Sequence, residues 1–139
     1  KIFNIKKKIF NFKKKGLAES KILFELKRKK INLICLAGFM KVLSKSFINN
    51  FDGKILNIHP SLLPKFKGLN TYSRMLKNNE KKAGCTVHYV SEKLDSGSTI
   101  IQKKFFINGK DDEIVLKNKT QKLEYVAFPE AIIKIFRDI

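Results

Sequence analysis

The segment Lys54–His59 constrains the fold most, because Pro60 follows it directly. Proline has no backbone N–H for a sheet ladder, so a strand over these residues is expected to end there. Upstream, Asn32–Gly38 is a largely apolar run without alternation, which is typical of a strand covered on both faces in a parallel sheet. Between the two segments, Ser44 is a suitable N-cap for a short helix that ends near Asn50. A strand, a helix and a second strand form a right-handed βαβ unit, so the sequence predicts an α/β fold.

The remaining segments extend this unit with helix and strand patterns. Apolar residues at helical spacing predict a helix over Leu17–Lys30. Cys85–Ser91 and Thr99–Ile107 are predicted strands with a short connection, which favours antiparallel pairing. The acidic start at Asp111 predicts a final helix that continues to about Pro129. We therefore expect a mostly parallel sheet with helices on both faces and an antiparallel C-terminal extension.

Length and cysteine usage narrow the class of protein. With 139 residues, the chain is expected to form one domain over residues 1–139. The apolar run Leu33–Met40 is far shorter than the about 20 residues that span a bilayer, so no membrane association is expected. Cys35 and Cys85 lack the spacing of metal ligands and lie in apolar strand patterns. We expect both to be small core residues in a cytoplasmic protein that binds no metal.

The formal net charge of +18 raises the question of a nucleic-acid partner. Residues 1–30 carry most of it, with twelve Lys or Arg against two Glu. Only Arg28, Arg74 and Arg137 are arginines among the 30 cationic residues, whereas contacts to base edges favour Arg. A basic nucleic-acid-binding module therefore remains an alternative, but the composition favours a Lys-rich solvated surface. Such a surface would also steer anionic substrates toward the protein.

Asn57 and His59 are candidate functional side chains at the end of the predicted strand. Alternate residues of a strand share a face, so the amide and the imidazole point the same way. Ligands of open α/β sheets bind at the carboxyl ends of strands. An amide donor and an imidazole at such an edge can stabilise an oxyanion and move a proton.

Five blocks of the sequence, in this order and spacing, carry a resemblance to a known family. They are Leu36–Leu43, Ile55–Pro64, Gly68–Asn70, Gly84–Val90 and Leu94–Gly97. In these blocks the chain resembles phosphoribosylglycinamide formyltransferase, from about Leu17 onward. The family pattern begins with a phosphate-binding loop that has no counterpart here. The resemblance therefore implies the C-terminal two-thirds of a longer protein, whose N-terminal part is missing, and inefficient turnover by these residues alone.

The resemblance implies a Rossmann-like formyltransferase fold and a reaction. A formyl group would pass from 10-formyltetrahydrofolate, acting as cosubstrate, to the amine of phosphoribosylglycinamide in de novo purine biosynthesis. The protein would be a cytoplasmic monomer or weak dimer without a specific nucleic-acid partner. Two other formyl-folate enzymes, formyltetrahydrofolate hydrolase and methionyl-tRNA formyltransferase, remain alternatives within the same chemistry.

The resemblance also implies roles for individual residues. Asn57 would donate a hydrogen bond to the oxyanion, and His59 would donate as well or carry the proton that the amine loses. Asp95, which on sequence alone is more typical of a turn, would orient His59 and raise its pKa. His88 is expected to be structural and to lie near the site. The implied folate contacts are Lys15, Met40, Lys41, Val42, Leu43 and Asn57, and the implied glycinamide-ribotide contact is Glu124.

Overall fold

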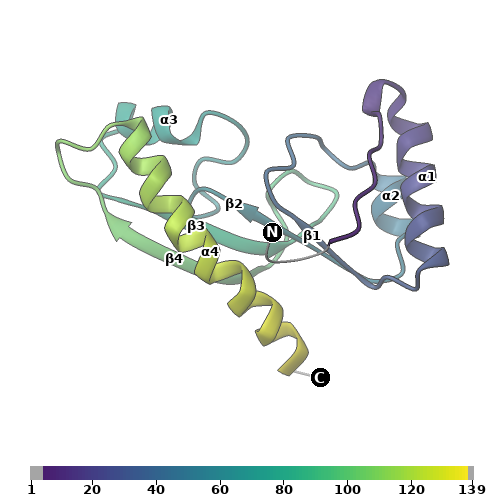
Figure 1. Cartoon of the computed structure of the whole chain (residues 1–139). Helices are drawn as coiled ribbons and strands as arrows, with labels where there is room; N and C mark the ends of the chain where they lie inside the picture. The colour runs from purple at the N-terminus through teal and green to yellow at the C-terminus, as the bar shows by residue number, and fades with distance from the viewer. Residues whose placement is uncertain (1–4, 138–139) are drawn as a thin grey trace.

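The structure, a computed structural model, describes residues 5–137. Its helices are α1 (Lys15–Arg28), α2 (Lys45–Asn50), α3 (Thr71–Lys77) and α4 (Glu113–Arg137), with a 3-10 turn, η1 (Phe12–Lys14), before α1. Its strands are β1 (Leu33–Leu36), β2 (Lys54–His59), β3 (Lys82–Tyr89) and β4 (Thr99–Phe106). Figure 1 shows α4 lying across β3 and β4, while α1 and α2 lie side by side near the other end of the sheet.

The four strands form one sheet in the order β1-β2-β3-β4. β1 and β2 are parallel, with Leu36 opposite Asn57. The helix α2 lies between them along the chain, which forms the predicted βαβ unit. β2 pairs antiparallel with β3, and β3 pairs antiparallel with β4. The antiparallel pairing of the last two strands is confirmed. Parallel pairing in residues 5–137 is limited to β1 and β2, because β3 returns alongside β2, so this part of the sheet is less parallel than predicted.

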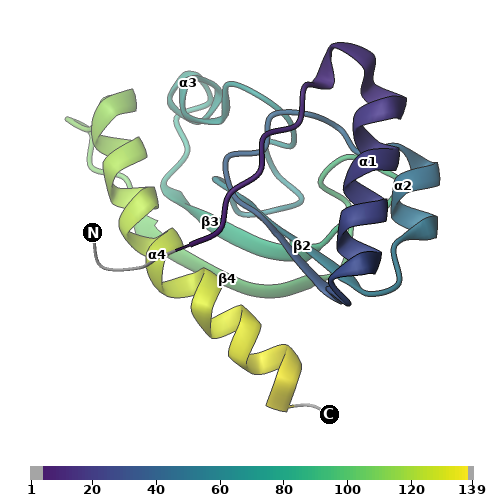
Figure 2. The same ribbon diagram turned by 45° about the vertical axis from the view of Figure 1, so that its right-hand side comes forward.

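Two hydrophobic cores lie on opposite faces of the sheet, and adjacent residues of β2 belong to different cores. Leu56 belongs to the core under α4, whereas Ile55 belongs to the core under α1 and α2, as strand alternation requires. Figure 2 shows the sheet between these two groups of helices, so the predicted cover on both faces is confirmed. The α4 core contains Leu56, Cys85, Val87, Ile100, Ala127, Ala131 and Ile135. The α1–α2 core contains Leu43, Phe47, Phe51 and Ile55, with Ile22, Leu23 and Leu26 packed against them.

β1 is less buried than its sequence predicts. It is an edge strand of the sheet formed by residues 5–137, and its residues Ile34 and Leu36 pack on the α1–α2 core. Cys35 has the opposite orientation and is exposed, because α4 packs mainly on β3 and β4, and Leu33 is the β1 residue that packs against its core. The expectation that Cys35 is a core residue is therefore wrong. Cys85 is fully buried, as predicted.

The helix boundaries follow local signals with small differences. Ser44 caps α2 as predicted, and its Oγ accepts a hydrogen bond from the Phe47 N–H at 3.0 Å. α1 begins at Lys15, before the predicted start, and α4 continues through Pro129. In residues 5–137, no helix combines the length and the apolar composition that a membrane span needs.

Candidate active site

The carboxyl end of β2 brings polar side chains from two strands together. Asn57 and His59 lie on one face of β2, and the antiparallel register places His88 opposite Asn57 and Thr86 opposite His59. Directly opposite residues of antiparallel strands present their side chains on the same face. His59, Thr86 and His88 are buried, and Asn57 is half-buried. This edge of the sheet therefore presents one amide and two imidazoles close together.

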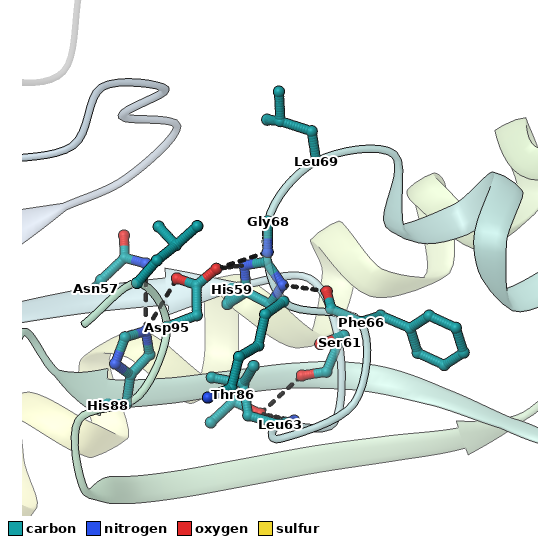
Figure 3. A network of polar contacts seen from close by, with 12 residues as sticks. Asn57, His59, Ser61, Leu63, Phe66, Gly68, Leu69, Thr86, His88 and Asp95 are labelled. Carbon is teal, nitrogen blue, oxygen red and sulfur yellow. Dashed lines mark hydrogen bonds and ion pairs between the residues drawn. The ribbon is translucent and has the colours of Figure 1, made fainter.

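Asp95 places a single carboxylate between the two imidazoles (Figure 3). Its Oδ2 lies 3.3 Å from Nδ1 of His59, and its Oδ1 lies 3.7 Å from Nε2 of His88. The N–H of Gly68 also donates to Oδ2, at 2.9 Å. Only 7% of the Asp95 side chain is exposed, so these contacts act with little screening by water. The structure thus places the predicted carboxylate directly beside His59.

The loop between β3 and β4 holds Asp95 in this position. Asp95 itself has a φ of 44°, in the left-handed region that Asp tolerates better than most residues. Tyr89 N–H donates to the Ser98 carbonyl at 3.0 Å, which closes the loop at its base. A Cβ at Gly97 would lie 1.7 Å from the carbonyl oxygen of Tyr89. Only glycine therefore allows the close approach of the two loop ends that returns Asp95 to the sheet.

His88 is held in one neutral tautomer. Its Nδ1 lies 2.8 Å from the Tyr89 carbonyl, so this nitrogen carries the proton and donates. Burial lowers the pKa of His88, although the Asp95 carboxylate acts in the opposite direction. Nε2 of the neutral ring is then an acceptor, and Nδ2 of Asn57, at 3.3 Å, donates to it. The His88 tautomer therefore fixes the orientation of the Asn57 amide, which keeps a second N–H free for a ligand.

His59 is engaged on both ring nitrogens. Its Nε2 lies 2.8 Å from the Phe66 carbonyl, and its Nδ1 faces Asp95. A neutral imidazole has one N–H, so both contacts are hydrogen bonds only when the ring carries two protons. This arrangement lets the ring take up a proton on the side of Asp95 without losing its contact with Phe66.

Thr86 fixes the loop that carries the Phe66 carbonyl. Its Oγ1 donates to the Ser61 carbonyl at 2.7 Å and accepts from the Leu63 N–H at 3.1 Å. Ser61 Oγ in turn donates to the Lys65 carbonyl at 2.6 Å. These bonds hold the residues between β2 and Phe66 against β3, and Figure 3 shows the two bonds of Thr86, to Ser61 and Leu63, beneath His59. No sequence signal predicts this role of Thr86, because threonine is common in any buried strand.

A cavity of about 70 Å³ opens beside Asn57 and Asp95. Lys41, Val42 and Leu43, which the resemblance assigns to folate binding, line its other side. His88 also lines the cavity, whereas His59 lies behind Asp95 and does not. The structure therefore brings part of the predicted folate contact together with two of the three predicted catalytic residues.

Three predicted binding residues lie outside this cavity. Met40 is 78% exposed. Lys15 begins α1, with its Nζ 3.9 Å from Oε1 of Glu19. Glu124 is half-buried on α4, and burial raises its pKa. Its charge acts on Tyr72, whose pKa is raised to about 12, mainly by burial.

Sequence reasoning placed His88 near the site but gave it no role beyond structure. Its position opposite Asn57 follows from the β2–β3 register, which the sequence alone did not define. Glu19 was missed as well, although it is a buried carboxylate. Among the side chains of residues 5–137, no three His, Cys, Asp or Glu residues are grouped as a metal site.

Comparison with known protein families matches residues 2–132 to the formyl transferase family. The chain is 44% identical over 108 residues to phosphoribosylglycinamide formyltransferase of Haemophilus influenzae, a match that covers 78% of this chain and 50% of that protein. It is 43% identical over 122 residues to the trifunctional purine biosynthetic protein adenosine-3 of Drosophila melanogaster, covering 88% of this chain and 9% of that protein.

Solved structures give the same result. The structure of phosphoribosylglycinamide formyltransferase from Bacillus halodurans superposes with a TM-score of 0.82 at 35% identity, covering 88% of this chain and 63% of that one. The predicted Rossmann-like α/β class is confirmed by this likeness. The chain thus spans half the length of the Haemophilus relative and under two thirds of the Bacillus structure.

Proposed function

Because this chain belongs to the formyl transferase family, we propose that it transfers a formyl group from 10-formyltetrahydrofolate to the amine of phosphoribosylglycinamide. The names of the relatives support this substrate and a role in purine biosynthesis. The observation that carries the proposal is the position of Asp95, whose carboxylate contacts His59 and His88 and borders the cavity beside Asn57.

The proposed reaction needs an oxyanion donor and a proton carrier. The amine nitrogen attacks the formyl carbon, and a tetrahedral intermediate with an oxyanion forms. The bond between this carbon and N10 of the folate then breaks, and one proton passes from the amine to N10. Stabilising the oxyanion by a fixed donor is typically the largest single contribution to such a transfer.

Three side chains divide this work in our proposal. Asn57 donates its free amide N–H to the oxyanion, since its other N–H is directed at His88. Asp95 lies between the cavity and His59, so it accepts the amine proton and passes it to the facing Nδ1. His59 holds that proton while its Nε2 stays anchored on Phe66, and it returns the proton toward N10 through Asp95, which borders the cavity. The expected direct bond from His59 to the oxyanion would require its ring to turn.

The same proposal assigns the binding contacts. The backbone of Met40, Lys41, Val42 and Leu43 would bind the pteridine of the folate together with Asn57, and three of these four residues line the cavity. Lys15 would contact the anionic part of the folate, and Glu124 would contact the glycinamide ribotide. Both assignments rest on the resemblance. Action in the cytoplasm, a monomeric or weakly dimeric state and the absence of a specific nucleic-acid partner rest on it too.

A single-turnover assay of the 139-residue chain tests the proposal. The chain would be mixed with 10-formyltetrahydrofolate and phosphoribosylglycinamide, and the formylated product measured by mass spectrometry. We expect product above the uncatalysed background, formed more slowly than the about 1 per second at the low end of ordinary enzymes. The variant His59→Ala should lose this activity while keeping its circular dichroism spectrum. Product formation that is absent from the folded chain, or that is equal in His59→Ala, would overturn the proposal.

A further inference from the structure

Glu19 is a buried carboxylate on α1 that the proposed reaction does not use. Only 5% of the residue is exposed. Carboxylates are rarely so buried unless their oxygens are paired with donors, because losing hydration is costly. The hydrogen-bond partners of Glu19 therefore indicate why its carboxylate is buried.

Both oxygens of Glu19 bind the same residue on another element. Oε1 accepts from the Ser44 N–H at 2.9 Å, and Oε2 accepts from Ser44 Oγ at 2.6 Å. Hydrogen bonds to an ionised carboxylate are shorter and stronger than neutral ones. Ser44 Oγ also accepts from the Phe47 N–H, so its hydroxyl both donates to α1 and caps α2. Glu19 thus fixes the start of α2 with a two-point contact.

Ser44 directly follows the part of the chain that lines the cavity. We call Lys41, Val42 and Leu43 the cavity loop, since all three border the cavity beside Asn57. Leu43 is buried in the α1–α2 core, whereas Lys41 and Val42 are exposed. The loop is therefore held at its C-terminal end by the packing of Leu43 and by the bonds from Glu19 to Ser44.

We propose that Glu19 is a positioning residue for the formyl donor, because it holds the cavity loop through Ser44 and draws Lys15 toward the same place. The Nζ of Lys15 lies 3.9 Å from Oε1, so one carboxylate links two groups that the proposed function assigns to folate binding. The inference rests on that proposed function and adds a residue that touches neither substrate. Preorganising a loop raises affinity by removing part of the ordering cost of binding.

The test uses four variants of the chain. Glu19→Ala removes the carboxylate, Glu19→Gln keeps its shape with one acceptor oxygen, and Ser44→Ala removes the hydroxyl. Glu25→Ala is the matched control, because it deletes a glutamate of the same helix that pairs with Lys8 and Arg28 instead of the loop. Circular dichroism checks that each variant is folded.

Two measurements are made on every variant. Hydrogen exchange of the backbone amides of residues 41–44 reports the order of the loop without any ligand. Calorimetric titration gives the Kd of 10-formyltetrahydrofolate with no acceptor present, and a second titration gives the Kd of phosphoribosylglycinamide. We expect Glu19→Ala to speed the exchange of Ser44 and to weaken folate binding about tenfold, the effect of about 1.4 kcal/mol.

A positioning role predicts that folate binding is affected selectively, whereas a purely structural role would lower stability without this selectivity. In Glu19→Ala and Ser44→Ala the Kd of phosphoribosylglycinamide should stay within about twofold, and Glu25→Ala should change neither Kd by more. Glu19→Gln should recover part of the folate affinity, since one oxygen still accepts from Ser44. Lower thermal stability with unchanged loop exchange and unchanged folate Kd would overturn the inference.

The two proposals fail in different ways. If the wild-type chain binds no 10-formyltetrahydrofolate, the proposed function is wrong, and exchange at Ser44 still decides whether Glu19 orders the loop. If Glu19→Ala does not fold, Ser44→Ala and Glu19→Gln carry the same comparison. Unchanged exchange and unchanged folate Kd in both of these variants would also overturn the inference.

Discussion

Asn57 and His88 face each other across β2 and β3, with the amide Nδ2 3.3 Å from the imidazole Nε2. The Tyr89 carbonyl holds the proton of His88 on Nδ1, which leaves Nε2 as an acceptor. The amide can therefore keep its orientation only while His88 is neutral. The free N–H of Asn57 is therefore directed by His88, which the sequence pattern predicts to be a structural histidine.

The first prediction concerns the oxyanion donor. In a form of the protein with full activity, Asn57→Ala should lower kcat by roughly 10²–10³, because a fixed donor to the transition state is lost. The Kd of the folate should change less than kcat. Single-turnover formyl transfer, with folding checked by circular dichroism, measures the effect, and a loss confined to folate binding would contradict it.

Asn57 and His59 act on the same transition state, so their losses should not add. We expect His59→Ala to cost at least as much as Asn57→Ala, because acid–base help alone gives about 10²–10⁴. The double variant should be far less impaired than the product of the two single losses. Strict additivity in the same assay would show that the two residues serve independent steps.

The lowered pKa of His88 predicts a pH dependence of stability. An unfolded chain takes up a proton at this ring near about pH 6.5, whereas the folded chain does so only at lower pH. The unfolded state therefore binds more protons in that window. The stabilisation is fully present above about pH 6.5 and is lost as the pH falls through the folded pKa.

Urea unfolding of the wild type and of His88→Gln at several pH values checks this slope. The variant should lose the part of the slope that His88 contributes. ¹⁵N chemical shifts of the wild type at neutral pH should show a protonated Nδ1 and a bare Nε2. Equal slopes in both proteins, or a protonated Nε2, would contradict the assigned tautomer.

Gly97→Ala should displace Asp95 by forcing the loop away from Tyr89. We expect a loss of about 1–3 kcal/mol in the free energy of unfolding, as for other overpacked sites. Formyl transfer should also fall, since the carboxylate moves from His59. Gly109→Ala is the control, because a Cβ there would meet nothing within 4 Å. Denaturant titration that found the two variants equally stable would contradict the prediction.

The two cysteines should differ sharply in reactivity. Burial raises the pKa of both thiols, but Cys35 is exposed to reagents, whereas Cys85 is buried and its pKa is raised to about 11. At about pH 8 the thiolate of Cys85 is therefore scarce as well as inaccessible. Titration with Ellman's reagent should modify only Cys35 in the folded chain and both thiols in guanidinium chloride. A Cys35→Ser variant that reacted rapidly while folded would show that Cys85 is open to reagents.

The excess of lysine predicts weak, salt-dependent binding of nucleic acid. For a sequence-independent Lys surface, we expect a Kd for duplex DNA of about 10⁻⁴–10⁻⁶ M at physiological salt. Fluorescence anisotropy with random and selected duplexes at fixed salt measures it. Sequence-specific binding tighter than about 10⁻⁸ M would support the alternative of a nucleic-acid-binding module.

Local signals were enough to predict much of this fold. Pro60 ended β2 and Ser44 began α2, because each acts through its own backbone or its nearest neighbours. The shared face of Asn57 and His59 followed from strand alternation alone. The exposure of Cys35 could not be predicted in this way, since it depends on which strands α4 packs against.

The longer-range contacts of the site could not be predicted from the sequence for the same reason. His88 faces Asn57 only through the register of β2 and β3, and Glu19 reaches Ser44 across 25 positions of sequence. An isolated glutamate on a Lys-rich helix is typical of a solvated surface, so nothing local indicated its burial. Hydrophobic periodicity defines the faces of an element but does not define its partner.

The alternation of Ile55 and Leu56 also has a dynamic consequence. Because β2 separates the two cores, we expect the α1–α2 core to open as a cooperative unit while Leu56 stays packed under α4. Such partial unfolding would withdraw Leu43 and the cavity loop and expose Asn57 and His88 to water, because Asn57 lies on the Ile55 face of β2, while the β2–β3 pairing stayed in place. The cavity loop and the β2–β3 pairing would then have separate lifetimes. The apparent affinity for any ligand of the cavity would then be proportional to the fraction of molecules in which the α1–α2 core is closed.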